Sequence, residues 1–124
     1  MKYEDKTRLI IGCAMYVHRK LGRGYPEVIY KRALAIEMQL SGLQFEQEKQ
    51  MDVIFRDQVI GWRSSDFIID NEIIVELKAT SELDDGHYVQ IFNYLHMHEK
   101  EIGLLLNFGA KSLEFKRVYN NHLH

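Results

Sequence analysis

The first forty residues of the chain carry apolar side chains at every third or fourth position, which is the period of an amphipathic helix. This pattern predicts one helix from about Thr7 to Leu21, where Gly22 provides a stop signal. A second helix is expected from about Pro26, a residue that suits a first helical turn, to Leu40. The predicted core stripes are Ile10, Ala14, Val17 and Leu21 in the first helix, and Ile29, Ala33, Ile36 and Leu40 in the second.

The middle of the chain changes to the alternation of apolar and polar residues that is typical of β-strands. One strand is expected from Gln44 to Phe55, and a turn at residues 56–58 leads into a second strand that starts at Val59, so that the two strands form a hairpin. Asp66 belongs to the second strand, and the apolar run Ile73–Ala79 forms the third.

The third strand carries two charges that a simple core strand would not tolerate. Ile73–Ala79 is apolar on both faces, yet Glu76 and Lys78 lie within it, two residues apart and therefore on the same face. Buried charges are costly unless they pair with each other or bind a metal ion. Two interpretations follow, an ion pair that satisfies the strand edge or a functional site.

Asp66 joins these two charges only if the hairpin between the second and third strands has a particular geometry. Directly opposed residues of an antiparallel pair share a face of the sheet. Asp66 lies opposite Glu76 if the turn centres on Asn71, whereas a two-residue loop would pair Asp66 with Val75. We therefore predict an odd-numbered loop or a bulge at this turn.

The last third of the chain predicts a helix and two further strands. A polar segment at residues 79–86 precedes a helix from about Asp85 to His98, on which His87, Gln90 and Tyr94 fall on one face. Ile102–Phe108 is apolar on both faces, as a buried strand is, and Ser112–Tyr119 alternates like an edge strand. The expected order is ααβββαββ, an α/β fold with a mixed central β-sheet flanked by helices.

Length and composition indicate one globular domain, residues 1–124, with 46% hydrophobic and 27% charged residues. The start of the chain lacks the apolar stretch of a signal peptide, and no apolar run approaches the roughly 18 residues of a membrane span, so we expect a cytoplasmic location and no membrane association. The net charge of −2 argues against strong binding of nucleic acid by the whole surface. A bound divalent cation would cancel part of this acidity locally.

The order of the charged motifs resembles that of a nuclease superfamily. An aspartate on one strand, Asp66, followed by Glu76-Leu77-Lys78 on the next, resembles the PD-(D/E)xK superfamily, whose fold is restriction-endonuclease-like. Gly24-x-x-Glu27-x-x-Tyr30 is similar to the signature of a small bacterial group within it, the GxxExxY family. Further matches cover nearly the whole chain: Val17-His18, Leu21–Gly24, His87–Gln90, Asn93–Leu95 and Leu105–Gly109. The chain departs from the family before Asp66, where Ser65 replaces a frequent proline and the usual arginine is displaced to position 63.

The resemblance implies a metal-dependent site that hydrolyses phosphodiester bonds. Carboxylates without a neighbouring cysteine favour Mg²⁺ or Mn²⁺ over structural zinc. The implied catalytic residues are Asp66, Glu76, Lys78 and Gln90; the implied metal ligands are Asp66, Glu76, the Leu77 carbonyl and Glu27; and candidates for lining a nucleic-acid groove are His18, Tyr30, His87 and Tyr94. Simpler explanations stay open, since Glu27 suits a helix N-terminus, His18 suits a packed position, and the polar face of the third helix suits solvent.

Three functions are consistent with these residues. The first is a Mg²⁺- or Mn²⁺-dependent nuclease that acts on nucleic acid, most naturally DNA. The second is a nucleic-acid-binding subunit that retains the fold without useful turnover, and the third is a protein-interaction module with a relic site. A homodimer would bring two sites to two strands, although no stretch of the sequence identifies an interface.

Overall fold

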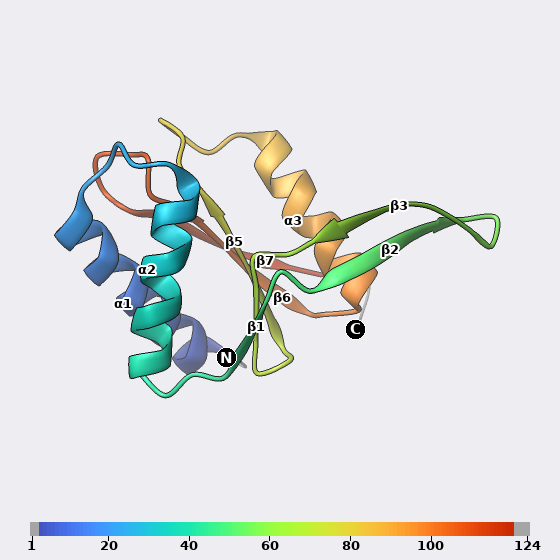
Figure 1. Ribbon diagram of the computed structural model, residues 1–124, viewed down its shortest axis with the longest axis horizontal. Coiled ribbons are helices and arrows are strands. Elements are labelled where there is room, and N and C mark those ends of the chain that lie inside the picture. The colour runs from blue at the N-terminus through green and yellow to red at the C-terminus, as the bar shows by residue number, and fades with distance from the viewer. Residues whose placement is uncertain (1–2, 121–124) are drawn as a thin grey trace.

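The computed structural model describes residues 3–120 as three helices and seven strands (Figure 1). No helix in this part of the chain is both long and apolar enough to cross a membrane. The elements are α1 (Glu4–Leu21), α2 (Glu27–Leu40), β1 (Phe45–Gln47), β2 (Gln50–Phe55), β3 (Gln58–Ser64), β4 (Phe67–Ile69), β5 (Ile73–Lys78), α3 (Asp85–His98), β6 (Ile102–Asn107) and β7 (Glu114–Tyr119).

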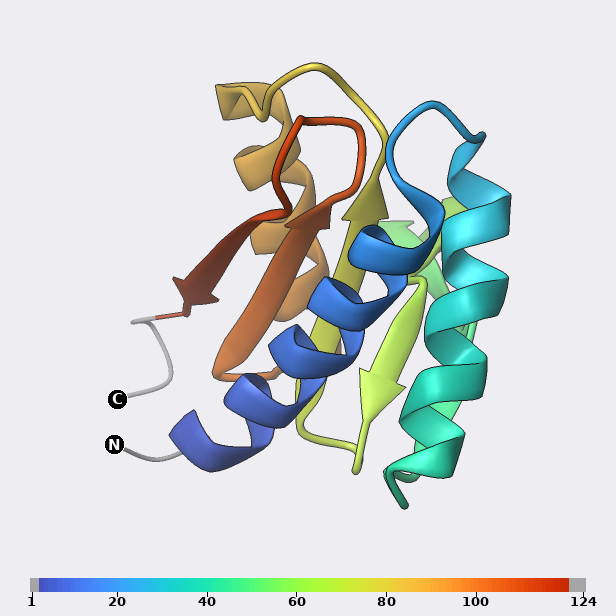
Figure 2. The same cartoon turned by 90° about the vertical axis from the view of Figure 1, so that its left-hand side faces the viewer.

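A five-stranded mixed sheet forms the centre of the molecule, with its strands in the order β1-β4-β5-β6-β7. The pairing of β5 with β6 is parallel, while the other three pairings are antiparallel. Helices α1 and α2 cover one face and α3 covers the other (Figure 2). The expected α/β class, a mixed sheet flanked by helices, is confirmed.

Strand β5 is the most central element because it is buried on both faces. Ile73, Val75 and Leu77 pack into the core beneath α1 and α2, whereas Ile74 packs into the core beneath α3. Because side chains alternate along a strand, Glu76 follows Ile74 onto the α3 face. The charges of this strand therefore lie between the sheet and α3.

The expected order of three strands between the second and third helices is wrong, because both of the first two predicted strands are broken. The predicted strand Gln44–Phe55 breaks after Gln47, where Glu48 takes a left-handed backbone conformation with φ of 50°. The next predicted strand breaks between Ser64 and Phe67. As a result β1 and β4 join the central sheet, while β2 and β3 pair with each other in a separate two-stranded sheet.

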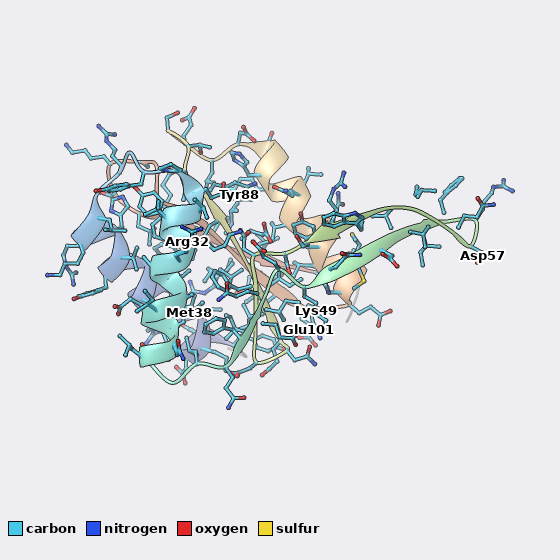
Figure 3. The ribbon with its side chains drawn as sticks, in the orientation of Figure 1. Arg32, Met38, Lys49, Asp57, Tyr88 and Glu101 are labelled. Carbon is cyan, nitrogen blue, oxygen red and sulfur yellow. The ribbon has the colours of Figure 1, made fainter. Side chains whose placement is uncertain are left out.

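This separate hairpin, residues 50–64, extends away from the body of the molecule, and we call it the arm (Figures 1 and 3). Its tip is a two-residue turn at Arg56 and Asp57, both with positive φ. A β-bulge interrupts the pairing between Val53 and Ile54, so that Ile60 on the facing strand has no paired residue. The hairpin predicted for this segment is confirmed, but its separation from the central sheet was not foreseen.

The core stripe predicted for the second helix is also wrong. The buried side chains of α2 are Tyr30, Leu34 and Met38, whereas Ile36 is 59% exposed and Leu40 is 77% exposed. Both stripes have the helical spacing of three or four residues, so periodicity alone does not distinguish them. In the first helix, Ile10, Ala14 and Val17 are buried as predicted.

Candidate active site

The hairpin between β4 and β5 has the odd-numbered loop that the sequence required. Phe67 pairs with Val75 and Ile69 pairs with Ile73, which leaves the three residues 70–72 as the loop. Asp70 and Asn71 both adopt positive φ, a conformation that Asn and Asp tolerate better than most residues. The register carried one step further sets Asp66 opposite Glu76, so this prediction is confirmed.

Asp66 and Glu76 are linked by two hydrogen bonds, in each of which a carboxylate oxygen accepts from a backbone N–H of the other strand. The Asp66 N–H donates to Glu76 Oε1 at 2.8 Å, and the Leu77 N–H donates to Asp66 Oδ2 at 2.8 Å. Asp66 is 8% exposed and Glu76 is 4% exposed. These hydrogen bonds fix two nearly buried carboxylates on adjacent strands, side by side and with little freedom.

Lys31 of α2 is a site residue that sequence reasoning missed. Its Nζ lies 2.9 Å from Asp66 Oδ1 and 2.9 Å from Glu48 Oε1. Burial lowers the pKa of Lys31, but the hydrogen bonds to the two carboxylates outweigh burial and raise it above its ordinary value. Lys31 lies four residues after Glu27, on the same face of the helix, and this spacing could have identified it from the sequence.

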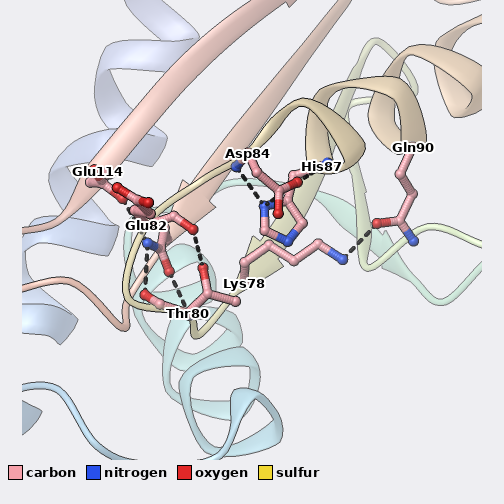
Figure 4. A network of polar contacts seen from close by, with 8 residues as sticks. Lys78, Thr80, Glu82, Asp84, His87, Gln90 and Glu114 are labelled. Carbon is pink, nitrogen blue, oxygen red and sulfur yellow. Dashed lines mark hydrogen bonds and ion pairs between the residues drawn. The ribbon is translucent and has the colours of Figure 1, made fainter.

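Lys78 does not pair with Glu76. Its Nζ donates to Gln90 Oε1 at 2.6 Å, and Figure 4 shows the Lys78 side chain extended from the sheet toward Gln90 on α3. Gln90 Nε2 in turn lies 3.4 Å from the Tyr94 hydroxyl. Within residues 3–120 no ion pair joins Lys78 to Glu76, so the simple ion-pair interpretation of the strand is not what the structure has. Gln90 holds the ammonium group instead.

Burial and mutual repulsion disfavour the ionised form of two carboxyl groups at this site, those of Glu76 and Glu27. Burial raises the pKa of Glu76 well above its ordinary value, and repulsion from the Asp66 carboxylate raises it further. Burial also raises the pKa of Glu27, again reinforced by Asp66, while Lys78 and other nearby cations oppose the shift. Glu27 on α2 therefore lies within electrostatic reach of Asp66 and Lys78. The excess of negative charge is what a bound cation would neutralise.

The donor set fits a hard divalent cation. Asp66 and Glu76 offer carboxylate oxygens, which Mg²⁺ and Mn²⁺ prefer, and the one cysteine of the chain, Cys13, lies buried against Ser41 in the helical layer. Among residues 3–120, no three His, Cys, Asp or Glu side chains are grouped closely enough to ligate one ion. Mg²⁺ commonly binds through one or two carboxylates and keeps several waters, so two carboxylates suffice for it.

The four candidates for a nucleic-acid groove lie in two different places. His18 and Tyr30 both pack against Phe108 in the core beneath α1 and α2. His18 Nε2 lies 3.0 Å from the Ala110 carbonyl, and the fully buried Tyr30 donates its hydroxyl to the Gly22 carbonyl at 2.6 Å. Tyr30 therefore does not line a groove, because its burial excludes substrate. His18 is packed against its neighbours, as the simpler explanation for this residue expects.

The other two candidates lie on α3, beside the carboxylates. His87 Nδ1 accepts a hydrogen bond from the Asp84 N–H at 3.0 Å, as part of a capping box that begins the helix. Burial raises the pKa of the Tyr94 hydroxyl, and the Glu76 carboxylate adds to the effect. Gln90, His87 and Tyr94 thus share one helix face, as predicted, and this face is turned toward the site.

Fold and site together are those of a nuclease-like α/β domain, and comparison with known proteins gives the family. A sequence model of the PD-(D/E)XK nuclease superfamily matches residues 4–118, so the chain belongs to that superfamily. The match does not resolve the finer GxxExxY grouping. No curated protein matches the chain.

Two solved structures share the fold. The crystal structure of SSO0001 is 20% identical in sequence, with a TM-score of 0.61 over 96% of this chain and 60% of that one. An alkaline exonuclease (LHK-Exo) from Laribacter hongkongensis is 9% identical, with a TM-score of 0.56 over 98% of this chain and 73% of that one. The present chain therefore spans about 60% of the length of SSO0001.

Proposed function

We propose that this protein is a nuclease that hydrolyses phosphodiester bonds, most naturally in DNA, with Mg²⁺ or Mn²⁺ as its cofactor. Membership of the nuclease superfamily supports the reaction class. The observation that carries the proposal is the alignment of Asp66 with Glu76 across two strands, with Lys78 following on the same face of β5. A structural ion pair would not need the second, costly carboxylate.

Each residue has a separate role in the proposed reaction. Asp66, Glu76 and the Leu77 carbonyl would hold the cation, and Glu27 would contact it through water. A hard divalent cation supplies charge stabilisation at the phosphate and favours ionisation of water. Lys78 positions the attacking water and stabilises negative charge that develops on the phosphate.

Gln90 supports this role of Lys78 by fixing the ammonium group. The hydrogen bond from Lys78 Nζ to Gln90 Oε1 uses one of the three ammonium hydrogens and aims the other two. An ammonium group held in this way suits electrostatic positioning better than the role of general base. Tyr94 and His87 complete the polar face of α3 around the site.

Cleavage of defined substrates tests the proposal. Labelled duplex, single-stranded and branched DNA, and RNA, are incubated with Mg²⁺, Mn²⁺ or EDTA. Asp66→Asn and Lys78→Met are compared with wild type, and Lys20→Met serves as the matched control because Lys20 lies on α1, against the Tyr16 ring. We expect cleavage that EDTA abolishes, that both site variants lose and that Lys20→Met retains. Equal cleavage by Lys78→Met and wild type would refute the proposal.

A second function, nucleic-acid binding without turnover, is favoured by one observation. Both oxygens of Asp66 already accept hydrogen bonds, from Lys31 and from the Leu77 N–H, so Asp66 itself is satisfied without an ion. Calorimetric titration with Mg²⁺ distinguishes the two functions. Retained DNA binding without metal binding or cleavage would select the binding subunit.

A homodimer is a further hypothesis for duplex substrates, and sedimentation of the protein with duplex DNA tests it.

A further inference from the structure

A cleft separates the arm from α3 and opens beside the candidate site. Its volume is about 460 Å³, and its walls include Val53, Ile60 and Arg63 from the arm and Gln90, Tyr94 and Met97 from α3. A volume of this size is typical of pockets that bind small organic groups. The arm was not foreseen in the sequence, so neither was this cleft.

The cleft is continuous with the candidate site because two residues belong to both. Gln90 holds the ammonium of Lys78, and Tyr94 lies within hydrogen-bonding distance of Gln90. The Glu76 carboxylate raises the pKa of the Tyr94 hydroxyl, which places that hydroxyl in the electrostatic field of the carboxylates. A strand whose phosphate lies at Lys78 would therefore present its adjacent nucleotide to the cleft.

The walls are mainly apolar and uncharged, with Arg63 as the one permanently charged side chain among the described residues that line them, and this chemistry suits a nucleobase better than a run of phosphates. Val53, Ile60 and Met97 supply apolar surface, on which the flat face of a base can pack. Asn93 supplies an amide, which can pair with a base edge. The arm has two acidic and two basic residues, Asp52, Asp57, Arg56 and Arg63, and so provides no positive track for phosphates.

Resting on the function proposed above, we infer that the cleft between the arm and α3 binds one unpaired nucleotide next to the scissile phosphate. A base within a continuous duplex is stacked and paired, so its face and edge are not available to side chains. The preferred substrates are therefore single-stranded DNA segments and unpaired ends. Continuous duplex is a poor substrate because a base must first leave the stack.

Two adjacent arm residues provide a matched test. Ile60 is 64% exposed and lines the cleft, whereas Val59 is 62% exposed and does not line it. Both side chains are similarly exposed, so glutamate at either position reaches solvent and is not buried in the hairpin. Only Ile60→Glu introduces a negative charge and removes apolar surface where the nucleotide would lie.

The experiment measures binding without turnover. Fluorescence anisotropy in EDTA follows labelled single-stranded DNA, blunt duplex and duplex with an unpaired flap, each titrated with wild type, Ile60→Glu or Val59→Glu. We expect wild type to bind the single strand and the flap about tenfold more tightly than blunt duplex, Ile60→Glu to lose about tenfold of that affinity, and Val59→Glu to change it less than twofold. Equal affinity for blunt duplex and single strand, or equal effects of the two variants, would overturn the inference.

Cleavage assays separate this inference from the proposed function. Cleavage that depends on Lys78 but proceeds equally on blunt duplex, single strand and flap, and equally in Ile60→Glu, would overturn the cleft while leaving the nuclease intact. Absence of cleavage on every substrate, together with the expected binding pattern, would overturn the nuclease and leave the nucleotide cleft standing. Absence of binding to any of the three DNAs would overturn the cleft.

Discussion

Lys31 Nζ lies 2.9 Å from Asp66 Oδ1, so a helix on one edge of the molecule supplies a positive charge to the carboxylate that we assign to metal binding. The contact is largely shielded from water, since the two side chains are 17% and 11% exposed. It neutralises part of the repulsion between Asp66 and Glu76 and links α2 to the entry of β4. Lys31 and a bound cation therefore stabilise the same carboxylates.

Replacement of Lys31 by methionine is expected to destabilise the metal-free protein by about 3 kcal/mol, because Asp66 then remains buried without its cationic partner. Urea denaturation in EDTA measures the change. The matched control is Lys49→Met, whose ion pair with Glu46 is long, at 3.8 Å, and more exposed, so we expect a change below about 0.5 kcal/mol. Addition of Mg²⁺ is expected to restore part of the stability of Lys31→Met. Equal losses in the two variants would contradict this role of Lys31.

Glu76→Gln is expected to stabilise the metal-free protein at pH 8. The folded-state pKa of Glu76 is raised, so its contribution favours folding below the unfolded pKa of about 4.5 and is lost as the pH rises through the folded pKa. Glutamine keeps the Oε1 acceptor for the Asp66 N–H but carries no charge. Thermal denaturation in EDTA from pH 4 to pH 8 measures the difference between variant and wild type.

The advantage of Glu76→Gln is expected to shrink as the pH falls, since wild-type Glu76 then becomes protonated. Metal affinity should show the opposite dependence in wild type, rising with pH as the carboxyl loses its proton. Glu82→Gln, at an exposed position after β5, is the control. A variant that is less stable than wild type by the same amount at every pH would show that the charge of Glu76 is not the cause.

Gln90→Ala is expected to lower kcat about tenfold with little change in KM, because Gln90 aims the Lys78 ammonium and does not itself carry charge. Lys78→Met removes the ammonium itself and should cost about a thousandfold. Initial rates of cleavage on single-stranded DNA measure both. Gln39→Ala, at the exposed end of α2, provides a comparison that should match wild type. A rise in KM with unchanged kcat would assign Gln90 to substrate binding instead.

Tyr30→Phe is expected to cost about 1–2 kcal/mol of stability while activity of the folded protein stays within about twofold of wild type. The Tyr30 hydroxyl donates to the Gly22 carbonyl and accepts from the Tyr25 N–H, so its loss leaves both backbone groups of this turn without that partner. Its ring, stacked on Phe108 in the core, is unchanged by the substitution. Urea denaturation and cleavage rates measured on the same samples separate the two effects. A large loss of kcat without a loss of stability would return Tyr30 to the active site.

The parts of the site that sequence predicted depend on short-range geometry. The alternation of side chains along β5 puts Glu76 on one face, and an odd loop around Asn71 brings Asp66 opposite it. Both rules act over a dozen residues, so no knowledge of distant contacts was needed. The same holds for Gln90 and Tyr94, whose spacing of four residues puts them on one face of a helix.

Other features depend on how distant elements meet. The choice between two apolar stripes of α2, the ion pair of Lys31 with Asp66 and the departure of the arm from the central sheet are all decided by packing. Glu48 illustrates the reason. Its left-handed backbone separates β1, which belongs to the central sheet, from β2, which belongs to the arm, although the apolar alternation continues through both strands. By itself the sequence determined the superfamily, through the resemblance of its motifs, and it determined the α/β class and the placing of Asp66, Glu76 and Lys78, because these follow from local periodicity. Only the tertiary structure decided which cation reaches Asp66 and where a cleft forms beside it, because burial and long-range contacts select among locally equivalent conformations.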